Sequence, residues 1–267
     1  MNLKKFFAIS LSFVSCLFIC NCVATENTVG SEIKKDEIFT LKLEGTRNTR
    51  DLGVYKTLEG KNLGHNLFFR SDNTSNLSDL DIEKLKKEYD LRYVIDLRSV
   101  EEVSSAPDKL SNIEGIKYYN IPVVISKEQI KSLIKGNYDL GDIFIESLNR
   151  KDIVKKIFDT ISSAEDGSVL FHCTNGKNRT GIVAALLLGL NGVSKEDIIS
   201  DYSALCKTTN NNNLESLLEP KAEHMKKLLK YIESEFGNIK AYLLDCGVSE
   251  KNLNRIENKF QKSVKTQ

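Results

Sequence analysis

The sequence has no tryptophan, only three histidines among its 267 residues and almost no net charge. Its 38 lysines and arginines nearly match its 37 aspartates and glutamates, which leaves a formal net charge of +1 at pH 7. A chain without a basic excess lacks the electrostatic footprint of a nucleic-acid-binding protein, so we expect no nucleic-acid partner. The scattered histidines (His65, His172 and His224) do not form a ligand set, so we expect no metal and no cofactor.

Long apolar runs are missing as well. The apolar stretch from Phe6 to Ile19 follows a positively charged start and is too short for a comfortable membrane span. We therefore assign residues 1–24 to an export signal and the polar residues 25–40 to a linker. The expected location is outside the cytoplasm, either secreted or in the cell envelope. A lipoprotein signal with Cys16, Cys20 or Cys22 as the lipidated residue is one alternative, and an uncleaved anchor is another.

Cysteine is scarce in the remainder of the chain. After signal removal only Cys173, Cys206 and Cys246 remain, too few for a disulfide scaffold. We expect Cys206 and Cys246 to be ordinary small apolar residues.

The most informative segment is VLFHCTNGKNRTG, residues 169–181. A strand-like apolar run ends at Cys173, a polar loop with one glycine follows, and an apolar helix begins. Backbone amides in such a loop can surround one oxyanion, and the positive end of the helix points at it. The planar guanidinium of Arg179 can donate two parallel hydrogen bonds to phosphoryl oxygens. The predicted phosphate-binding residues are Thr174, Asn175, Gly176, Lys177, Asn178, Arg179 and Thr180.

Cys173 and Arg179 are the predicted catalytic residues of this loop. A ring of amides, a helix N-terminus and a guanidinium all favour a thiolate, so we expect the pKa of Cys173 to be lowered. The thiolate would attack a phosphate monoester and form a phosphocysteine, which water then hydrolyses. Thr180 can donate its hydroxyl to the sulfur when the thiolate leaves. We expect His172 to brace the loop, with a hydrogen-bonded core histidine as the alternative.

The loop resembles the protein tyrosine phosphatase signature. From about Leu43 to Phe260 the chain resembles bacterial tyrosine and lipid phosphatases that carry a His-Cys-x-x-Gly-Lys-Asp-Arg-Thr loop. One departure is Asn178, which stands where that family has an acid, and it leaves a neutral hydrogen-bonding residue there. The segments that carry the resemblance are residues 48–53, 67–72, 94–102, 192–202 and 236–249.

The general acid is a third predicted catalytic residue. A phenolate or alkoxide leaving group needs a proton, so a carboxylic acid should face the loop. The resemblance makes Asp96, at the end of a predicted strand, the candidate acid, with an ion pair to Arg98 or a turn cap as the alternative. Asp139, Asp142 and Asp51 are further candidates.

Lys177 bears on the substrate. Loops with lysine at this place look like those of phosphoinositide and dual-specificity phosphatases, where it adds a contact for a second phosphate. A lysine that points to water is the alternative. Phosphotyrosine, phosphoserine or phosphothreonine, and phosphoinositides therefore all stay open as substrates. We expect membrane contact only with a lipid anchor or a lipid substrate, and the sequence does not determine the oligomeric state.

Alternation of strands and helices predicts an α/β fold, a single domain with a mostly parallel central sheet flanked by helices. By resemblance it is tyrosine phosphatase-like, spans residues 41–262 and leaves a tail at 263–267. The predicted strands are 38–43, 93–97, 118–125 and 168–171. The principal predicted helices are one that begins after the cap Ser78, then 127–136, 143–162 and 182–190.

Two other functions share parts of this pattern. A pseudophosphatase would keep the phosphate-binding loop without turnover, and Asn178 together with the missing obvious acid is its support. A sulfur-transfer enzyme would carry a persulfide on Cys173, but the Arg-Thr-Gly helix start suits a phosphate dianion better. The hydrolase stays the first hypothesis, because a binding module has no need of the nucleophile.

Overall fold

Five strands form one sheet in the computed structural model, which describes residues 40–204 and 214–261. The strand order is β1-β2-β5-β3-β4, and only the short β1 runs antiparallel to its neighbour. The central strand β5 therefore lies between two parallel partners. Its C-terminal end lies in the middle of the row of strand ends on that side of the sheet. The strands are β1 (Arg50–Asp51), β2 (Phe68–Ser71), β3 (Leu91–Asp96), β4 (Lys117–Asn120) and β5 (Ser168–His172).

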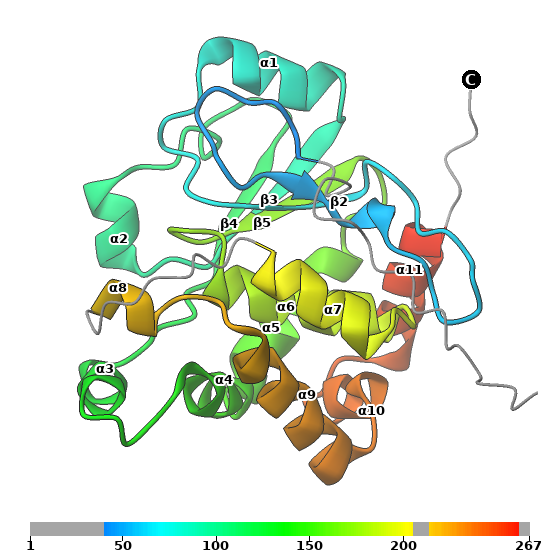
Figure 1. The fold of residues 1–267 in the computed structure, drawn as a ribbon. Helices are drawn as coiled ribbons and strands as arrows, with labels where there is room; N and C mark the ends of the chain where they lie inside the picture. The colour runs from blue at the N-terminus through cyan, green and yellow to red at the C-terminus, as the bar shows by residue number, and fades with distance from the viewer. Residues whose placement is uncertain (1–39, 205–213, 262–267) are drawn as a thin grey trace, which may run out of the picture. The chain divides into compact units, whose positions relative to one another are not determined.

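Helices cover both faces of the sheet unequally (Figure 1). Helix α1 lies on one face, and most of the other helices pack on the opposite face. The short 3-10 turn η2 (Leu52–Val54) follows β1. The helices are α1 (Asp79–Lys87), α2 (Val100–Ser105), α3 (Lys127–Ile134), α4 (Leu140–Leu148), α5 (Lys151–Ser162), α6 (Asn178–Leu190), α7 (Lys195–Ser203), α8 (Leu214–Leu217), α9 (Ala222–Phe236), α10 (Ile239–Asp245) and α11 (Glu250–Gln261).

Two apolar clusters lie on the two faces because side chains alternate along each strand. Phe69 and Leu170 belong to the smaller cluster, which includes residues of α1. Phe68 and Phe171 belong to the larger cluster, which holds α5, α6 and the C-terminal helices against the sheet. Burial on both faces explains why the central strand is a continuous apolar run. The predicted fold class, an α/β domain with a mostly parallel sheet, is confirmed.

Several predicted elements are found where the sequence pattern places them. Ser78 caps α1 by accepting from the Asp81 amide at 3.2 Å. Of the strand expected over 118–125, only the first part is present, as the edge strand β4; the strand ends before Pro122, which has no amide hydrogen. The predicted helix 182–190 is the buried part of α6, which also includes the Arg-Thr-Gly segment.

Two predicted elements need correction. The single helix expected over 143–162 is two helices, α4 and α5, because the chain breaks at Arg150, whose backbone (φ −80°, ψ 61°) is not helical. Of the strand expected over 38–43, the described part holds one isolated bridge, from Thr40 to Arg50. The export signal, most of the linker, Cys206 and the tail lie outside the described residues.

Parallel pairing brings three strand ends to one edge of the sheet. Ser71 of β2 and Asp96 of β3 both stand in register with His172 at the end of β5. Residues that follow these strands therefore meet, although they lie far apart in the chain. No helix within the described ranges is long and apolar enough to cross a membrane.

Candidate active site

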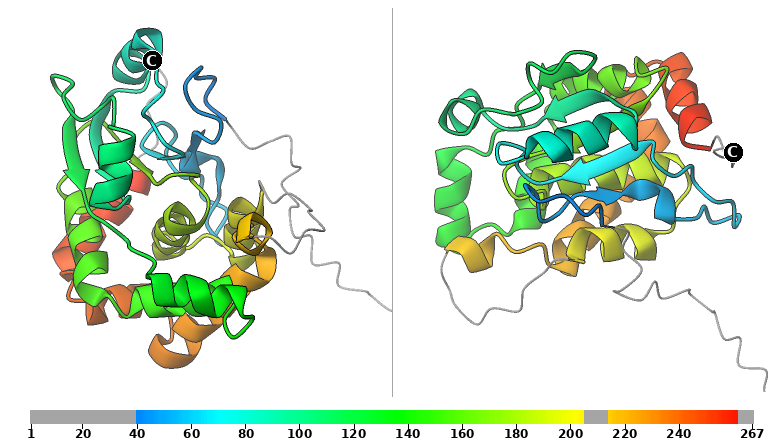
Figure 2. Two further views of the ribbon diagram at one scale, coloured as in Figure 1. Left: turned by 90° about the vertical axis from the view of Figure 1, so that its left-hand side faces the viewer. Right: turned by 90° about the horizontal axis from the view of Figure 1, so that it is seen from above.

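The loop between β5 and α6 lies at the middle of this sheet edge. Its first residue, Cys173, is 3% exposed, and α6 begins at Asn178. The left view of Figure 2 looks towards this edge, with α6 seen end-on and α2, α3 and α8 around it. The predicted arrangement of strand, cysteine, loop and buried helix is present, and the positive end of α6 faces the loop.

The carbonyl side of the loop is bound from behind by two side chains. Arg70 Nη2 donates to the carbonyl of Gly176 at 2.7 Å and to that of Lys177 at 3.2 Å. Asn48 Nδ2 donates to the carbonyl of Asn175 at 3.0 Å. Because a peptide's carbonyl and amide point in opposite directions, holding the carbonyls outward turns the loop amides inward. The first two segments of the family resemblance therefore shape the loop.

Gly176 is required at the tightest point of this contact. Its φ is +64°, a conformation that side chains rarely adopt. A Cβ there would lie 2.6 Å from the carbonyl oxygen of Ser71 and 2.7 Å from Asn48 Nδ2. The glycine lets the loop approach its support closely.

Asp201 on α7 completes the support. Its carboxylate pairs with Arg70 and accepts from Arg50 Nε at 3.1 Å and from the Tyr55 hydroxyl at 3.3 Å. All four side chains are buried. Burial acts against the charge of Asp201, but the two guanidiniums outweigh it and lower the pKa of the carboxyl. A buried charge needs such partners, and here they fix the position of Arg70.

The pKa of the Cys173 thiol is lowered. Burial acts to raise it, but the positive charge of Arg179 and hydrogen-bonding groups of Thr180 and Asn175 outweigh burial. The lowered pKa of Cys173 agrees with the prediction from the sequence. A thiolate at the floor of the loop is a nucleophile without further deprotonation.

Arg179 is held by Glu102 in a two-pronged ion pair. Arg179 Nη1 lies 2.7 Å from Oε2, and Nη2 lies 2.7 Å from Oε1. The Thr174 hydroxyl donates to Oε1 at 2.5 Å and accepts from Nη2 at 3.1 Å. The hydrogen bonds from Arg179 are the largest cause that lowers the pKa of Glu102, to about 2. The plane of the Arg179 guanidinium is therefore fixed by Glu102 in the absence of a ligand.

Sequence reasoning assigned Glu102 no role. Helix α2 positions it, because the Ser99 amide donates to Oε2 at 2.8 Å while the Ser99 hydroxyl accepts from the Glu102 amide at 3.2 Å. The signal was present as a Ser-x-x-Glu capping box directly after β3. The partner, 77 residues away along the chain, could not be read from that pattern.

Asp96 lies in a buried group of charges beside the loop. Its two oxygens accept from Arg98 Nε and Nη2 at 2.7 to 3.1 Å, and Oδ2 also accepts from the Tyr118 hydroxyl at 2.7 Å. Burial acts to raise the pKa of Asp96, but these contacts and His172 outweigh it and lower the pKa. The alternative interpretation, an ion pair with Arg98, is confirmed. Asp96 stays a predicted acid, and its contacts favour the ionised form.

His172 belongs to the same group. Its Nε2 lies 2.8 Å from Asp108 Oδ2, its Nδ1 lies 3.3 Å from the carbonyl of Cys173, and the ring is fully buried. Burial acts to lower the pKa of His172, but Asp108 and then Asp96 outweigh it and raise the pKa. These two contacts hold His172, the residue before the nucleophile, in place.

Asp96, Asp108 and His172 lie close enough to form a candidate metal site. The Arg98 guanidinium already pairs with both carboxylates, because its Nη2 lies 2.7 Å from Asp96 Oδ2 and 3.6 Å from Asp108 Oδ2. The guanidinium lies between the two carboxylates, and the His172 ring contacts Asp108. The donor set therefore fits an internal ion-pair group better than a divalent metal.

Residues 41–262 match the model of the family described as "Tyrosine phosphatase family". The chain belongs to the tyrosine phosphatase family. The resemblance recognised from the loop and its supporting segments is thereby confirmed, and the protein is an enzyme of the tyrosine phosphatase class.

Relatives at moderate identity agree with this assignment. A tyrosine-protein phosphatase of Nostoc commune is 28% identical over 216 residues, which cover 71% of this chain and 72% of the relative. A putative tyrosine-protein phosphatase of Cupriavidus necator, H16_A0669, is 25% identical over 230 residues, which cover 77% and 83%. Among solved structures, TpbA of P. aeruginosa is 14% identical and covers 68% of this chain and 87% of its own, with a TM-score of 0.38.

Two loop residues of the phosphatase have partners outside the loop. Lys177 Nζ forms an ion pair with Glu219 at 2.7 Å, so it does not simply point to water. Asn178 donates to the carbonyl of Leu218 at 2.9 Å and accepts from the Tyr202 hydroxyl at 2.9 Å. Asn178 thus links the start of α6 to α7 and to the segment after α8. An acid at this position would lose the donor to Leu218.

The other candidate acids have structural contacts that involve no loop residue. Asp139 caps α4 and binds Lys227 at 3.1 Å, and Asp142 binds the same lysine at 2.7 Å. Asp51 accepts from the backbone amide of Asn66 at 3.0 Å and lies 3.1 Å from the His65 ring. These contacts give all three carboxylates a role in holding local structure.

Replacing Glu102 tests its positioning role. Glu102→Gln keeps the size of the side chain but leaves Arg179 with a neutral partner that offers one acceptor instead of two. A misplacement of about 1 Å can cost on the order of 100-fold in rate, so we expect kcat/KM to fall about 10- to 100-fold in steady-state assays with an aryl phosphate. Glu101→Gln, an exposed neighbour on the same helix, is the matched control. Equal activity of the two variants would contradict the positioning role.

The lowered thiol pKa predicts alkylation of Cys173 at neutral pH. The thiolate is lost only as pH falls through its lowered pKa, so the midpoint of iodoacetamide reactivity against pH should lie below the ordinary value of about 8.5. Arg179→Gln should raise the midpoint, because it removes the charge that favours the thiolate. Cys173→Ser retains Cys206 and Cys246 and gives the background rate; burial raises the pKa of Cys246. A wild-type midpoint at or above 8.5 would refute the prediction.

Proposed function

We propose that this phosphatase hydrolyses phosphate monoesters through a phosphocysteine on Cys173. The thiolate sulfur attacks phosphorus in line, the bond from phosphorus to the ester oxygen breaks, and that oxygen takes a proton from Asp96, the predicted acid, which regains one from the attacking water of the second step. Water then attacks the phosphocysteine, which releases inorganic phosphate and restores the thiolate. The observation that carries this proposal is the combination of a lowered thiol pKa with loop amides and a fixed guanidinium around one point.

Arg179 supports the reaction through its Nε–H. Nη1 donates to Glu102 and to the carbonyl of Leu97 at 3.4 Å, and Nη2 donates to Glu102 and to the Thr174 hydroxyl. Of the five N–H donors of the guanidinium, Nε–H has no partner among the described residues and is the donor left for phosphoryl oxygens. Donors fixed in advance stabilise the charge of the transition state without reorganisation.

Phosphotyrosine is the first proposed substrate, because the relatives that cover most of this chain are named as tyrosine-protein phosphatases. Phosphoserine, phosphothreonine and phosphoinositides are proposed as further substrates. Lys177 is the observation in favour of phosphoinositides, since an ammonium in the loop can contact a second phosphate. Its ion pair with Glu219 means that such a phosphate would share the ammonium with the carboxylate.

Release of phosphate by the chain from Thr25 to Gln267, beside Cys173→Ser, tests the mechanism. The panel is a phosphotyrosine peptide, a phosphoserine peptide and a phosphatidylinositol phosphate. We expect release that disappears in the variant, because serine offers no thiolate.

The panel also separates the substrates. A lipid preference that Lys177→Met removes, with phosphotyrosine turnover unchanged, would support the second phosphate contact. A wild type that binds phosphate yet releases none from any substrate would contradict the hydrolase and favour the pseudophosphatase.

We further propose that the enzyme is exported. The support is the sequence of residues 1–24, a positively charged start followed by an apolar stretch. N-terminal sequencing of the protein recovered from the medium or envelope of producing cells should find Thr25 as the first residue. A lipid-modified cysteine would indicate the lipoprotein alternative, and an intact Met1 in the cytoplasm would contradict export.

A further inference from the structure

Glu219 lies beside the phosphate-binding loop, and the proposed reaction gives it no role. Its carboxylate lies 2.7 Å from the Lys177 ammonium. Glu219 is 4% exposed, and the side chain of Lys177 is 20% exposed. Glutamate is almost never fully buried without a partner of opposite charge. The two residues therefore form a largely buried ion pair at the edge of the site.

The segment that carries Glu219 is fixed against the loop. Glu219 lies between α8 and α9, and the carbonyl of Leu218 before it accepts from Asn178 Nδ2 at 2.9 Å. Pro220 after it is buried, and the Lys221 amide donates to the carbonyl of Glu219 at 2.9 Å. The left view of Figure 2 shows α8 beside α6, on a different side from α2. The carboxylate therefore cannot turn away from the ammonium unless this segment moves.

The ion pair determines which charges a second anionic group would meet. Lys177 belongs to the loop that surrounds the first phosphate, so an anion that reaches its ammonium lies next to that phosphate. Glu219 already binds the same ammonium, so this anion would also come close to a buried carboxylate. Like charges repel strongly at short range where little water separates them. A substrate with one phosphate avoids this repulsion.

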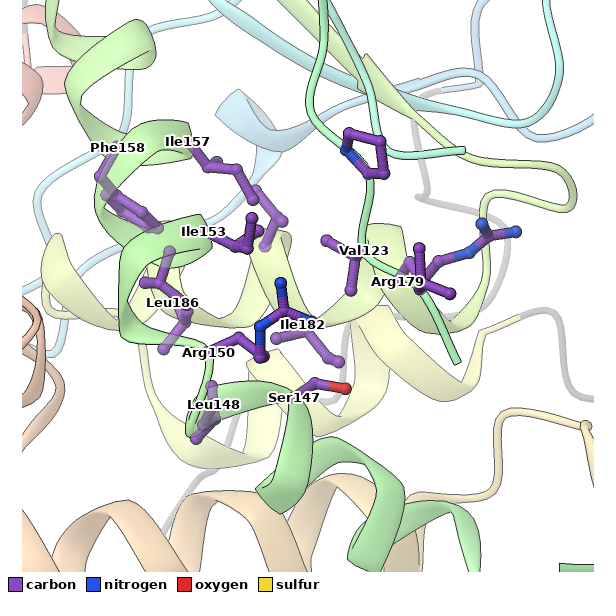
Figure 3. A pocket seen from close by; sticks show the side chains of 14 residues that line it. Val123, Ser147, Leu148, Arg150, Ile153, Ile157, Phe158, Arg179, Ile182 and Leu186 are labelled. Atoms are coloured by element: carbon purple, nitrogen blue, oxygen red, sulfur yellow. The ribbon is translucent and has the colours of Figure 1, made fainter. Parts of the chain in front are cut away.

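A pocket beside Arg179 does not offer a second phosphate another place. Aliphatic side chains such as Val123 and Ile182 line it, with Arg150 among them (Figure 3). Its accessible volume is about 30 Å³, room for about two water molecules. Arg150 is exposed, and its Nε lies 3.7 Å from the carboxylate of Asp152. We therefore expect a second phosphate to lie by Lys177 instead.

We propose that Glu219 makes the enzyme select substrates with a single phosphate over those with a second phosphate next to the first. The inference rests on the proposed function, because it concerns which monoesters enter the loop. Glu219 acts through Lys177: it accepts from the ammonium and offsets the attraction of that charge for a further anion. Phosphotyrosine meets the condition, and an inositol ring with neighbouring phosphates does not. The inference therefore places such phosphoinositides below phosphotyrosine as substrates.

Glu219→Gln tests the selection. In the full chain with Cys173→Ser, calorimetry measures the binding of phenyl phosphate and of an inositol bisphosphate with neighbouring phosphates. Glutamine keeps the size and the acceptor but not the charge, so the bisphosphate should bind about 10-fold more tightly. Binding of phenyl phosphate should change much less, because the loop amides and Arg179 hold its phosphate. The gain should shrink in high salt, since it is electrostatic.

Two further variants control this experiment. Glu223→Gln removes the same charge at an exposed position in the first turn of α9 and should leave the ratio of the two affinities unchanged. Adding Lys177→Gln to Glu219→Gln should remove the gain, because the second phosphate then lacks the ammonium.

The outcomes separate this inference from the proposed function. An unchanged affinity ratio in Glu219→Gln, beside firm binding of phenyl phosphate, would overturn the selection and leave the phosphatase intact. An equal loss for both ligands, or a gain that Glu223→Gln shares, would also overturn it. Clearly tighter binding of the bisphosphate than of phenyl phosphate by the chain with native Glu219 would overturn it without any change at that position. A gain that is specific to Glu219→Gln and depends on Lys177 supports the selection even where Cys173-dependent phosphate release fails.

Discussion

The structure of this site depends on how the carbonyls of one loop are bound. A backbone can surround an oxyanion with amides only when its carbonyls face elsewhere and have donors there. Arg70 and Asn48 supply those donors, and Asp201 neutralises and fixes Arg70. These three residues come from a strand, the chain before β1 and α7. The sheet order matters because it places β2 next to β5, where Arg70 reaches the loop.

Charged side chains lie behind, beside and at the mouth of the loop. Behind it, two arginines share Asp201. Beside it, Arg98 and His172 contact Asp96 and Asp108. At the mouth, Arg179 and Glu102 form a fixed pair. The thiolate is favoured because the nearest charge, Arg179, is positive and close, and burial alone would have the opposite effect.

The sequence by itself determined the local parts of this enzyme. Nucleophile, loop, Gly176 and the apolar helix α6 are contiguous, and short-range rules of strand, turn and helix start suffice for them. Only the tertiary structure decided the pairings. Glu102 binds Arg179, Glu219 binds Lys177, and Asp96 is held by Tyr118 as well as Arg98. Most of these partners lie tens of residues apart, and which of many equivalent carboxylates meets a given cation is fixed by strand order and helix packing, which no local pattern contains.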